Sequence, residues 1–294
     1  MLIARLIADQ PDWETRLRTL SEALVAAGME LQSIGALPEL GAVWELRLMG
    51  GTAAQLLDAI DAHIGPCDCL VSEAEIEVPR LFVSDMDSTM IGQECIDELA
   101  DFAGLKEQIS EITERAMQGE LDFERALLER VGLLEGLEEG AIDRCLSERI
   151  SPTPGARVLT QTLKAKGART VLVTGGFHHF ADEVADWLGF DRVVGNRLGV
   201  AQGKLTGRLD GPISDASTKL ATLREEAAKL GEGARILGSG DGANDIPMLE
   251  AADYGFAYRA KPKAREMANG RVDRGDLTVI LSLLGIPKEE WIGS

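Results

Sequence analysis

The sequence predicts an α/β protein with a doubly wound, mainly parallel sheet, and three features of its pattern indicate this. From about residue 80 onward, short apolar runs alternate with segments whose apolar residues have helical spacing, which is typical of a parallel sheet covered by helices. Residues 90–150 interrupt this alternation with an almost wholly helical pattern. Residues 1–77 have the order βαββαβ, which predicts a ferredoxin-like α+β domain.

The N-terminal 77 residues divide into four strands and two helices. Apolar residues three and four apart predict a first helix that ends at Gly28, and Thr52 is an N-cap for a second helix that ends at Gly65. The expected strands cover residues 2–8, 29–37, 43–49 and 69–74, and the expected helices cover residues 13–27 and 52–64. We expect a domain boundary at residues 77 and 78.

The remaining residues, 78–294, predict a core with a helical insertion. Four amphipathic stretches lie between residues 90 and 150, too long a segment for a loop, so we expect a helical cap at about residues 92–152. The expected core strands cover residues 81–83, 169–173, 192–196, 199–205, 234–237 and 254–257, and the expected core helices cover residues 156–166, 180–188, 218–230, 246–251 and 277–284.

Composition limits the classes of function. The chain has 294 residues, 45% of them hydrophobic, and a net charge of -19, which argues against nucleic acid or an anionic membrane as a partner. No apolar run approaches the roughly 20 residues of a membrane span, and the N-terminus has no pattern of a secretory signal. The four cysteines form no C-x-x-C pair, which favours reduced thiols and a cytoplasmic location.

Two acids follow the apolar run at residues 81–83. In an open α/β sheet, ligands bind at the carboxyl ends of the strands, where Asp85 and Asp87 stand. Residues two apart on an extended segment point the same way, so both carboxylates can face one ligand. Because ionised carboxylates repel each other, the pair predicts a bound cation or a retained proton.

The stretch Asp85-Met86-Asp87-Ser88-Thr89 resembles the nucleophile motif of the haloacid-dehalogenase-like phosphatases, and its continuation to Glu94 is similar to the phosphoserine phosphatase family in particular. Three later stretches match this family in the same order: residues 174–176, residues 203–219 and residues 238–245. The resemblance covers residue 80 to the C-terminus and implies that the helical insertion is a cap over the site. The N-terminal domain is similar to the ACT-like domains found before some cores of this family, where a regulatory and a dimerising role are both open.

This resemblance implies the chemistry of the acids. Asp85 is expected to attack phosphorus and form an aspartyl-phosphate, and Asp87 is expected to act as general acid and base. Mg²⁺ would be held by Asp85, Asp241 and the backbone carbonyl at Asp87, because it prefers hard oxygen ligands. Asp245 would orient Lys219 or a metal-bound water.

The resemblance also implies a phosphate cradle. Thr174, Gly175 and Gly176 would surround the phosphate with a hydroxyl and backbone N–H groups. Lys219 would neutralise charge on the phosphoryl group, and Asn244 would hydrogen-bond the substrate. The family usually has Ser at the position of Thr174, which keeps the hydroxyl but weakens the substrate assignment.

Glu94 and Arg130 are the expected substrate-selective pair, because a serine phosphate ester carries an ammonium and a carboxylate that these side chains can bind. Met117 and Phe123 resemble apolar cap residues that close over the ligand, although a role in the helix core is as good an interpretation. His178 and His179 are expected only to begin a helix.

The expected activity is the Mg²⁺-dependent hydrolysis of the small molecule O-phospho-L-serine, the last step of L-serine biosynthesis. The alternatives are phosphoryl transfer to another hydroxyl acceptor, or hydrolysis of another small phosphate ester. A non-catalytic amino-acid sensor would predict loss of Asp85, Asp87 or Lys219, and all three are present. A homodimer through the N-terminal domain is a further expectation.

Overall fold

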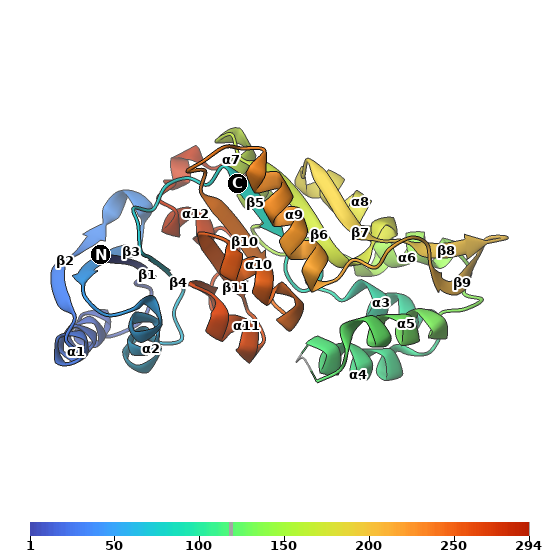
Figure 1. Ribbon diagram of the computed structural model, residues 1–294, viewed down its shortest axis with the longest axis horizontal. Helices are drawn as coiled ribbons and strands as arrows, with labels where there is room; N and C mark the ends of the chain where they lie inside the picture. The colour runs from blue at the N-terminus through green and yellow to red at the C-terminus, as the bar shows by residue number, and fades with distance from the viewer. Residues whose placement is uncertain (118–119, 294) are drawn as a thin grey trace.

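The computed structural model describes residues 1–117 and 120–293. Figure 1 shows an elongated molecule, with the N-terminal strands at one end, the core sheet in the middle and the first cap helices at the other end. One ten-stranded sheet joins the first two parts, in the order β2-β3-β1-β4-β12-β11-β10-β5-β6-β7. Its strands are β1 (Leu2–Ile7), β2 (Glu30–Leu37), β3 (Val43–Met49), β4 (Cys69–Ser72), β5 (Leu81–Ser84), β6 (Arg169–Phe177), β7 (Arg192–Asn196), β10 (Ile236–Gly240), β11 (Tyr254–Tyr258) and β12 (Gly270–Val272).

The N-terminal part has the expected order βαββαβ. Strand β1 pairs antiparallel with β3 and β4, and helices α1 (Trp13–Ala26) and α2 (Ala53–His63) bury their apolar residues against these strands. Thr52 and Gln55 form a capping box at the start of α2, as the sequence predicted. Strand β4 also pairs antiparallel with β12 of the core, so the domain boundary at residue 77 stays a prediction.

The core strands β12, β11, β10, β5, β6 and β7 are all parallel. Phe82 packs into one apolar cluster, and its neighbours Leu81 and Val83 pack into another on the opposite face, because successive side chains of a strand alternate. The first cluster includes residues of α7 (Ala156–Ala165), α8 (His178–Leu188) and α12 (Val279–Leu283), and the second includes residues of α9 (Ala216–Ala228) and α10 (Ile246–Ala251). The α/β prediction is therefore confirmed.

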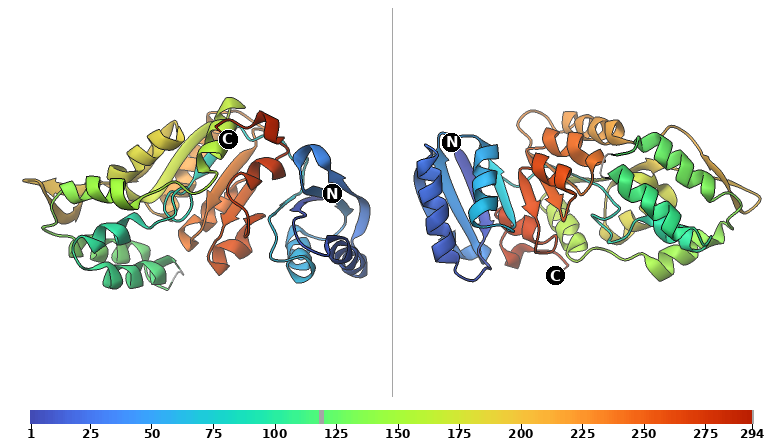
Figure 2. Two further views of the ribbon diagram at one scale, coloured as in Figure 1. Left: turned by 180° about the vertical axis from the view of Figure 1, so that it is seen from behind. Right: turned by 90° about the horizontal axis from the view of Figure 1, so that it is seen from below.

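Four helices form the insertion between β5 and α7: α3 (Cys95–Asp101), α4 (Lys106–Met117), α5 (Phe123–Leu133) and α6 (Gly140–Arg149). Figure 2 shows them gathered at the end of the molecule away from the N-terminal strands. The two connections to the core lie side by side, because Ile91 pairs with Pro152 and the Gln93 side chain bonds both the N–H and the hydroxyl of Ser151.

The expected strand over residues 199–205 is wrong, because this segment turns back on itself. Strands β8 (Leu198–Ala201) and β9 (Lys204–Leu209) form an antiparallel hairpin. Gln202 and Gly203 occupy its turn with φ values of 55° and 74°, the left-handed backbone that two-residue hairpin turns require. The hairpin contacts the cap through hydrogen bonds between Leu205 and residues 136 and 137.

Two short elements of the core were not expected, helix α11 (Pro262–Met267) and strand β12. Strand β12 lies between β11 and the N-terminal strand β4, and Arg265 of α11 binds Asp61 of α2. No helix among the described residues is long and apolar enough to cross a membrane.

Candidate active site

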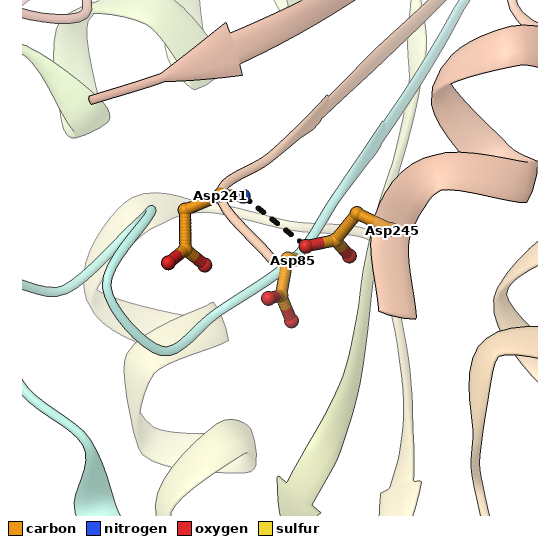
Figure 3. Close-up of side chains that lie close together, drawn as sticks. All are labelled: Asp85, Asp241 and Asp245. Carbon is orange, nitrogen blue, oxygen red and sulfur yellow. Dashed lines mark hydrogen bonds between the residues drawn. The ribbon is translucent and has the colours of Figure 1, made fainter. Parts of the chain in front are cut away.

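The site lies at the carboxyl ends of the central parallel strands. Asp85 directly follows β5, Asp241 directly follows β10, and Thr174 stands in the last part of β6. Figure 3 shows the carboxylates of Asp85, Asp241 and Asp245 gathered at these strand ends. Because β5 is hydrogen-bonded to both β10 and β6, the sheet brings together residues that are far apart in the sequence.

Lys219 joins two of these acids. Its ammonium lies 2.7 Å from Asp85 Oδ1 and 2.6 Å from Asp245 Oδ1, and its side chain is 0% exposed. Burial lowers the pKa of Lys219, but the two carboxylates outweigh it and raise the pKa above its ordinary value. Lys219 is therefore a fixed positive charge beside Asp85.

Asp245 has both carboxylate oxygens engaged. Oδ1 accepts from Lys219, and Oδ2 accepts the backbone N–H groups of Asp241 at 3.1 Å and Gly242 at 3.0 Å. A Cβ at position 240 would lie 2.3 Å from Asp245 Cγ, so only glycine fits there. Asp245 thus fixes the loop that carries Asp241.

Asp85 and Asp241 keep oxygens free for a ligand. Asp85 Oδ2 and Asp241 Oδ1 are buried and have no hydrogen-bond partner among the described residues, and one oxygen from each of Asp85, Asp241 and Asp245 lies within 4.8 Å of the others. Burial and the Asp245 charge raise the pKa of both acids, to about 7 for Asp241, while Lys219 opposes this. Unpartnered carboxylate oxygens in a site of repelling acids fit a divalent cation.

Asp87 lines the same cavity as Asp85 and has hydrogen-bond partners of its own. Its Oδ1 accepts the Cys95 N–H at 2.9 Å, and its Oδ2 accepts the Thr174 hydroxyl at 3.4 Å. Burial raises its pKa, and the hydrogen bonds from Cys95 lower it. The net direction is upward, which favours a protonated carboxyl group.

Two glycines follow Thr174 at positions where neighbouring groups leave no room for a side chain. A Cβ at Gly175 would lie 2.7 Å from the Phe123 ring, and a Cβ at Gly176 would lie 2.7 Å from Asp87 Oδ2. The Gly176 N–H donates to the Thr174 hydroxyl at 2.8 Å. A side chain at either glycine would push away the cap or the acid, so this turn of the chain needs glycine.

One cavity joins the core residues to the cap. Glu94, Phe123 and Arg130 of the cap segment line it together with Asp85, Asp87, Thr174, Gly175, Gly176 and Asn244. Its volume is about 30 Å³, which is small for a serine phosphate ester. The cap segment therefore forms one wall of the site, and binding of an ester of that size requires side chains of this wall to move.

The two cap charges of this cavity have opposite signs. Glu94 accepts the Ser88 hydroxyl at 2.6 Å, and burial together with the Asp87 and Asp241 charges raises its pKa well above the usual range. Arg130 is only 5% exposed. A ligand that carries both an ammonium and a carboxylate would match this pair.

Comparisons with known proteins agree with this geometry. Residues 82–250 match the family of haloacid dehalogenase-like hydrolases. The chain belongs to this family. A phosphoserine phosphatase of Archaeoglobus fulgidus is 44% identical over 211 residues, which cover 71% of this chain and 61% of that protein. The chain thus spans less than two thirds of the length of that relative.

Solved structures of the haloacid dehalogenase-like hydrolases extend the likeness. A family hydrolase from Salmonella enterica serovar Typhi has a TM-score of 0.79 at 29% identity and covers 97% of this chain and 99% of that one. A phospho-aspartyl intermediate analogue of a phosphoserine phosphatase has a TM-score of 0.65 at 38% identity and covers 70% of this chain and 98% of that one. Within the hydrolase family, the chain therefore groups with the phosphoserine phosphatases.

The structure of this hydrolase brings most of the predicted site residues together. Lys219 and Asp245 lie beside Asp85, and Phe123 lines the cavity with Glu94 and Arg130. Met117 ends α4, and its side chain is outside the described part of the chain. The two histidines begin α8 as expected.

Sequence reasoning missed three residues that hold site residues in place: Asn196, Thr113 and Asp97. The Asn196 amide donates to the Gly175 carbonyl at 2.8 Å and so fixes the phosphate turn. Its position at the end of β7, the next strand of the sheet, was an available signal. Thr113 and Asp97 stand inside cap helices with no such signal.

Proposed function

We propose that this hydrolase converts O-phospho-L-serine and water into L-serine and phosphate, the last step of L-serine biosynthesis. The observation that carries the proposal is the single cavity in which Asp85 and Asp87 face Glu94 and Arg130. The core acids supply phosphoryl chemistry, and the cap charges match the two charged groups of an amino acid.

Asp85 is the proposed nucleophile. Its carboxylate oxygen forms a bond to phosphorus while the bond from phosphorus to the seryl oxygen breaks. Lys219, 2.7 Å from Asp85 Oδ1, favours the ionised form of Asp85 against the burial and the Asp245 charge that raise its pKa, and it attracts the phosphoryl oxygens. The relatives' phospho-aspartyl analogue supports a covalent intermediate at this position.

Asp87 is the proposed general acid and base. Burial raises its pKa and so favours the protonated carboxyl group, and this proton passes to the seryl oxygen as serine leaves. The resulting carboxylate then takes a proton from the water that attacks the aspartyl-phosphate. Phosphate is released, Asp85 is regenerated, and Asp87 is again protonated.

Mg²⁺ is the proposed metal, held by the free oxygens of Asp85 and Asp241 and by the backbone carbonyl at Asp87. When bound, it neutralises charge on the phosphate and fixes the angle of attack. The donor set supports this choice, since carboxylate and carbonyl oxygens suit Mg²⁺ better than softer metals.

The remaining residues bind and orient the substrate. Thr174, Gly175 and Gly176 are proposed to surround the phosphate. Asn244, whose Oδ1 has no hydrogen-bond partner among the described residues, is proposed to accept a hydrogen bond from the substrate. Glu94 would pair with the ammonium and Arg130 with the carboxylate, while Phe123 closes the cavity and excludes water. Cytoplasmic location and dimerisation through the N-terminal region stay predictions.

The test is phosphate release from a panel of esters, with Mg²⁺ and with a chelator. The panel holds L-phosphoserine, D-phosphoserine, phosphothreonine, phosphoethanolamine and a sugar phosphate. We expect L-phosphoserine to lead by orders of magnitude and activity to require Mg²⁺. A leading sugar phosphate would contradict the substrate, and transfer to an added alcohol in place of water would indicate a phosphotransferase.

A further inference from the structure

A chain of hydrogen bonds across three cap helices holds the guanidinium of Arg130. Arg130 Nε, on α5, donates to the Ala126 carbonyl at 3.1 Å, and its Nη1 donates to Thr113 Oγ1 of α4 at 2.9 Å. Thr113 Oγ1 in turn lies 2.6 Å from Asp97 Oδ1 of α3. Each member of this chain is buried, with Thr113 only 3% exposed.

The direction of these bonds follows from chemistry. A guanidinium only donates, so the Thr113 oxygen must accept from Arg130. The hydroxyl hydrogen of Thr113 then has two acceptors, the Asp97 carboxylate at 2.6 Å and the Ile109 carbonyl at 3.0 Å. The carboxylate is closer and is the stronger acceptor. The order of donation is therefore Arg130 to Thr113 to Asp97.

This chain leaves part of the guanidinium free for a ligand. Of the five N–H groups of Arg130, the two bonds to Ala126 and Thr113 use one on Nε and one on Nη1. The other Nη1 hydrogen and both Nη2 hydrogens have no partner among the described residues, on a side chain that lines the active-site cavity. An arginine without fixed partners loses rotamer entropy when a ligand orders it, so this chain of bonds pre-organises the group that binds.

We propose that Thr113 and Asp97 are positioning residues that set the enzyme's selectivity for a substrate carboxylate. They touch no substrate themselves and act by fixing the angle of the Arg130 fork. This inference rests on the proposed function, in which Arg130 binds the carboxylate of phosphoserine. Selectivity for the carboxylate would then depend on how α3, α4 and α5 pack against one another, as well as on Arg130 itself.

The test compares two esters that differ at the carboxylate, O-phospho-L-serine and phosphoethanolamine, in wild type, Thr113→Val and Thr113→Ser. Thr113→Val keeps the shape and removes the hydroxyl, and Thr113→Ser keeps the hydroxyl as the matched control. We expect Thr113→Val to lower kcat/KM for phosphoserine by about 10- to 100-fold, mainly through KM, as for a lost hydrogen bond to a charged group. For phosphoethanolamine we expect no change beyond about twofold, and Thr113→Ser should behave as wild type.

A second variant keeps the inference testable if Thr113→Val does not fold. Asp97→Asn retains an acceptor for the Thr113 hydroxyl but loses the charge, and we expect a smaller fall for phosphoserine, about threefold, again without change for phosphoethanolamine. In an Arg130→Ala background neither variant should reduce activity further, because the positioned group is absent.

The outcomes separate the two proposals. If wild type hydrolyses both esters equally well, the proposed substrate is wrong and the inference falls with it. If wild type prefers phosphoserine but Thr113→Val lowers both esters to the same degree, or changes neither, the positioning role alone is overturned. A selective loss that Arg130→Ala abolishes supports it.

Discussion

At the scale of single residues, the site has more negative than positive charge. Four acids of the core segment, Asp85, Asp87, Asp241 and Asp245, are buried around Lys219. Burial, and then this excess of negative charge, raise the pKa values of Asp85 and Asp241, since both disfavour ionisation. An anionic phosphate would add to the repulsion, and a bound divalent cation would offset it.

Lys219→Met should cost both stability and activity. The change leaves Asp85 and Asp245 without their shared counter-charge, and breaking a buried ion pair costs about 3–5 kcal/mol. We expect the free energy of unfolding in urea to fall by about that amount and kcat/KM to fall at least about 100-fold. Lys229→Met, at the exposed C-terminal cap of the same helix, is the control and should change stability far less than Lys219→Met. Equal effects of the two variants would contradict the buried role of Lys219.

Asp241→Asn should separate metal binding from folding. Without Mg²⁺, the variant should be at least as stable as wild type, because the raised pKa of Asp241 shows that its charge is unfavourable in the fold. Mg²⁺ at about 100 times its Kd should stabilise wild type by about 2.7 kcal/mol and Asp241→Asn far less. Thermal unfolding with and without Mg²⁺ measures this, with Asp186→Asn on the exposed face of α8 as control. An unchanged Mg²⁺ effect in Asp241→Asn would exclude Asp241 as a ligand.

Asp85→Asn should abolish turnover and leave the fold intact. The amide cannot attack phosphorus, and loss of a nucleophile costs on the order of 10⁴-fold or more. Circular dichroism and a phosphate-release assay give the two readouts. Residual activity near the normal rate, with the mutation verified, would assign the nucleophile elsewhere.

The sequence predicted the positions of the candidate catalytic acids better than those of the residues that support the site. Asp85, Asp87 and Asp241 follow strands, so the rule that ligands bind at strand ends placed them together. Thr113 and Asp97 have no such marker, because a threonine or an aspartate inside an amphipathic helix reads as part of its polar face. Their role depends on how α3, α4 and α5 pack, and one sequence does not specify that.

At the scale of elements, several contacts attach the cap to the core. The two connecting segments pair at Ile91 and Pro152, and the β8–β9 hairpin bonds to the loop after α5. On the side of α11, the Lys261 ammonium lies 2.6 Å from Glu114 Oε2 of α4. The Lys261 N–H also donates to the Asp241 carbonyl at 2.8 Å. The ion pair between Lys261 and Glu114 therefore joins the cap to the core next to Asp241.

Lys261→Met should weaken closure of the cap. Both partners are partly exposed, so the pair contributes at most about 1 kcal/mol, or about fivefold in the closed population. We expect KM for phosphoserine to rise by about two- to fivefold, and 0.5 M salt, roughly three times physiological strength, to reduce the difference from wild type by screening the pair. Lys263→Met, two residues further along the chain at an exposed position of α11, should leave KM unchanged. An effect on KM that does not change with salt would show that the charge of Lys261 is not the cause.

Elements with a clear apolar pattern were predictable, and elements without one were not. The bounds of β3 and α10 match the expected ranges, because each has such a pattern between turn residues. Helix α11 and strand β12 have six and three residues, few of them apolar, and show no such pattern. Pro262 at the first turn of α11 was an available start signal. The β8–β9 hairpin lacked the usual Asn-Gly marker, since Gln202 takes the left-handed position.

At the scale of the whole molecule, the N-terminal region is joined firmly to the core. Strand β4 continues the core sheet through β12, and the Asp68 carboxylate accepts the backbone N–H groups of Asp273, Arg274 and Gly275 at 2.7–2.8 Å. Pairing between strands 200 residues apart is not visible in a sequence pattern, which is why two separate sheets were the natural expectation. A continuous sheet favours a fixed orientation of the N-terminal strands relative to the active site.

An ion-pair group beside this junction gives a pH-dependent test of it. Asp61 of α2 binds Arg265 of α11 with both oxygens, at 2.7 and 2.9 Å, and also binds Arg271 of β12 at 2.5 Å. Burial raises the pKa of Asp61, but the two arginines outweigh it and hold the pKa below its ordinary value of 3.8. A lowered carboxylate pKa contributes stability above the unfolded value and loses it as the pH falls through the folded value.

Asp61→Asn should therefore destabilise the protein at neutral pH and not in acid. Arg271 is 3% exposed, and leaving such a group without its charged partner costs about 1–3 kcal/mol. In urea unfolding, we expect the difference from wild type to be constant above about pH 5 and to shrink as the pH falls below 3.8. Asp58→Asn, on the exposed side of the same helix, should match wild type at every pH. A difference that persists in acid would show that Asp61 acts through packing, and the junction would then depend on the β4–β12 pairing alone.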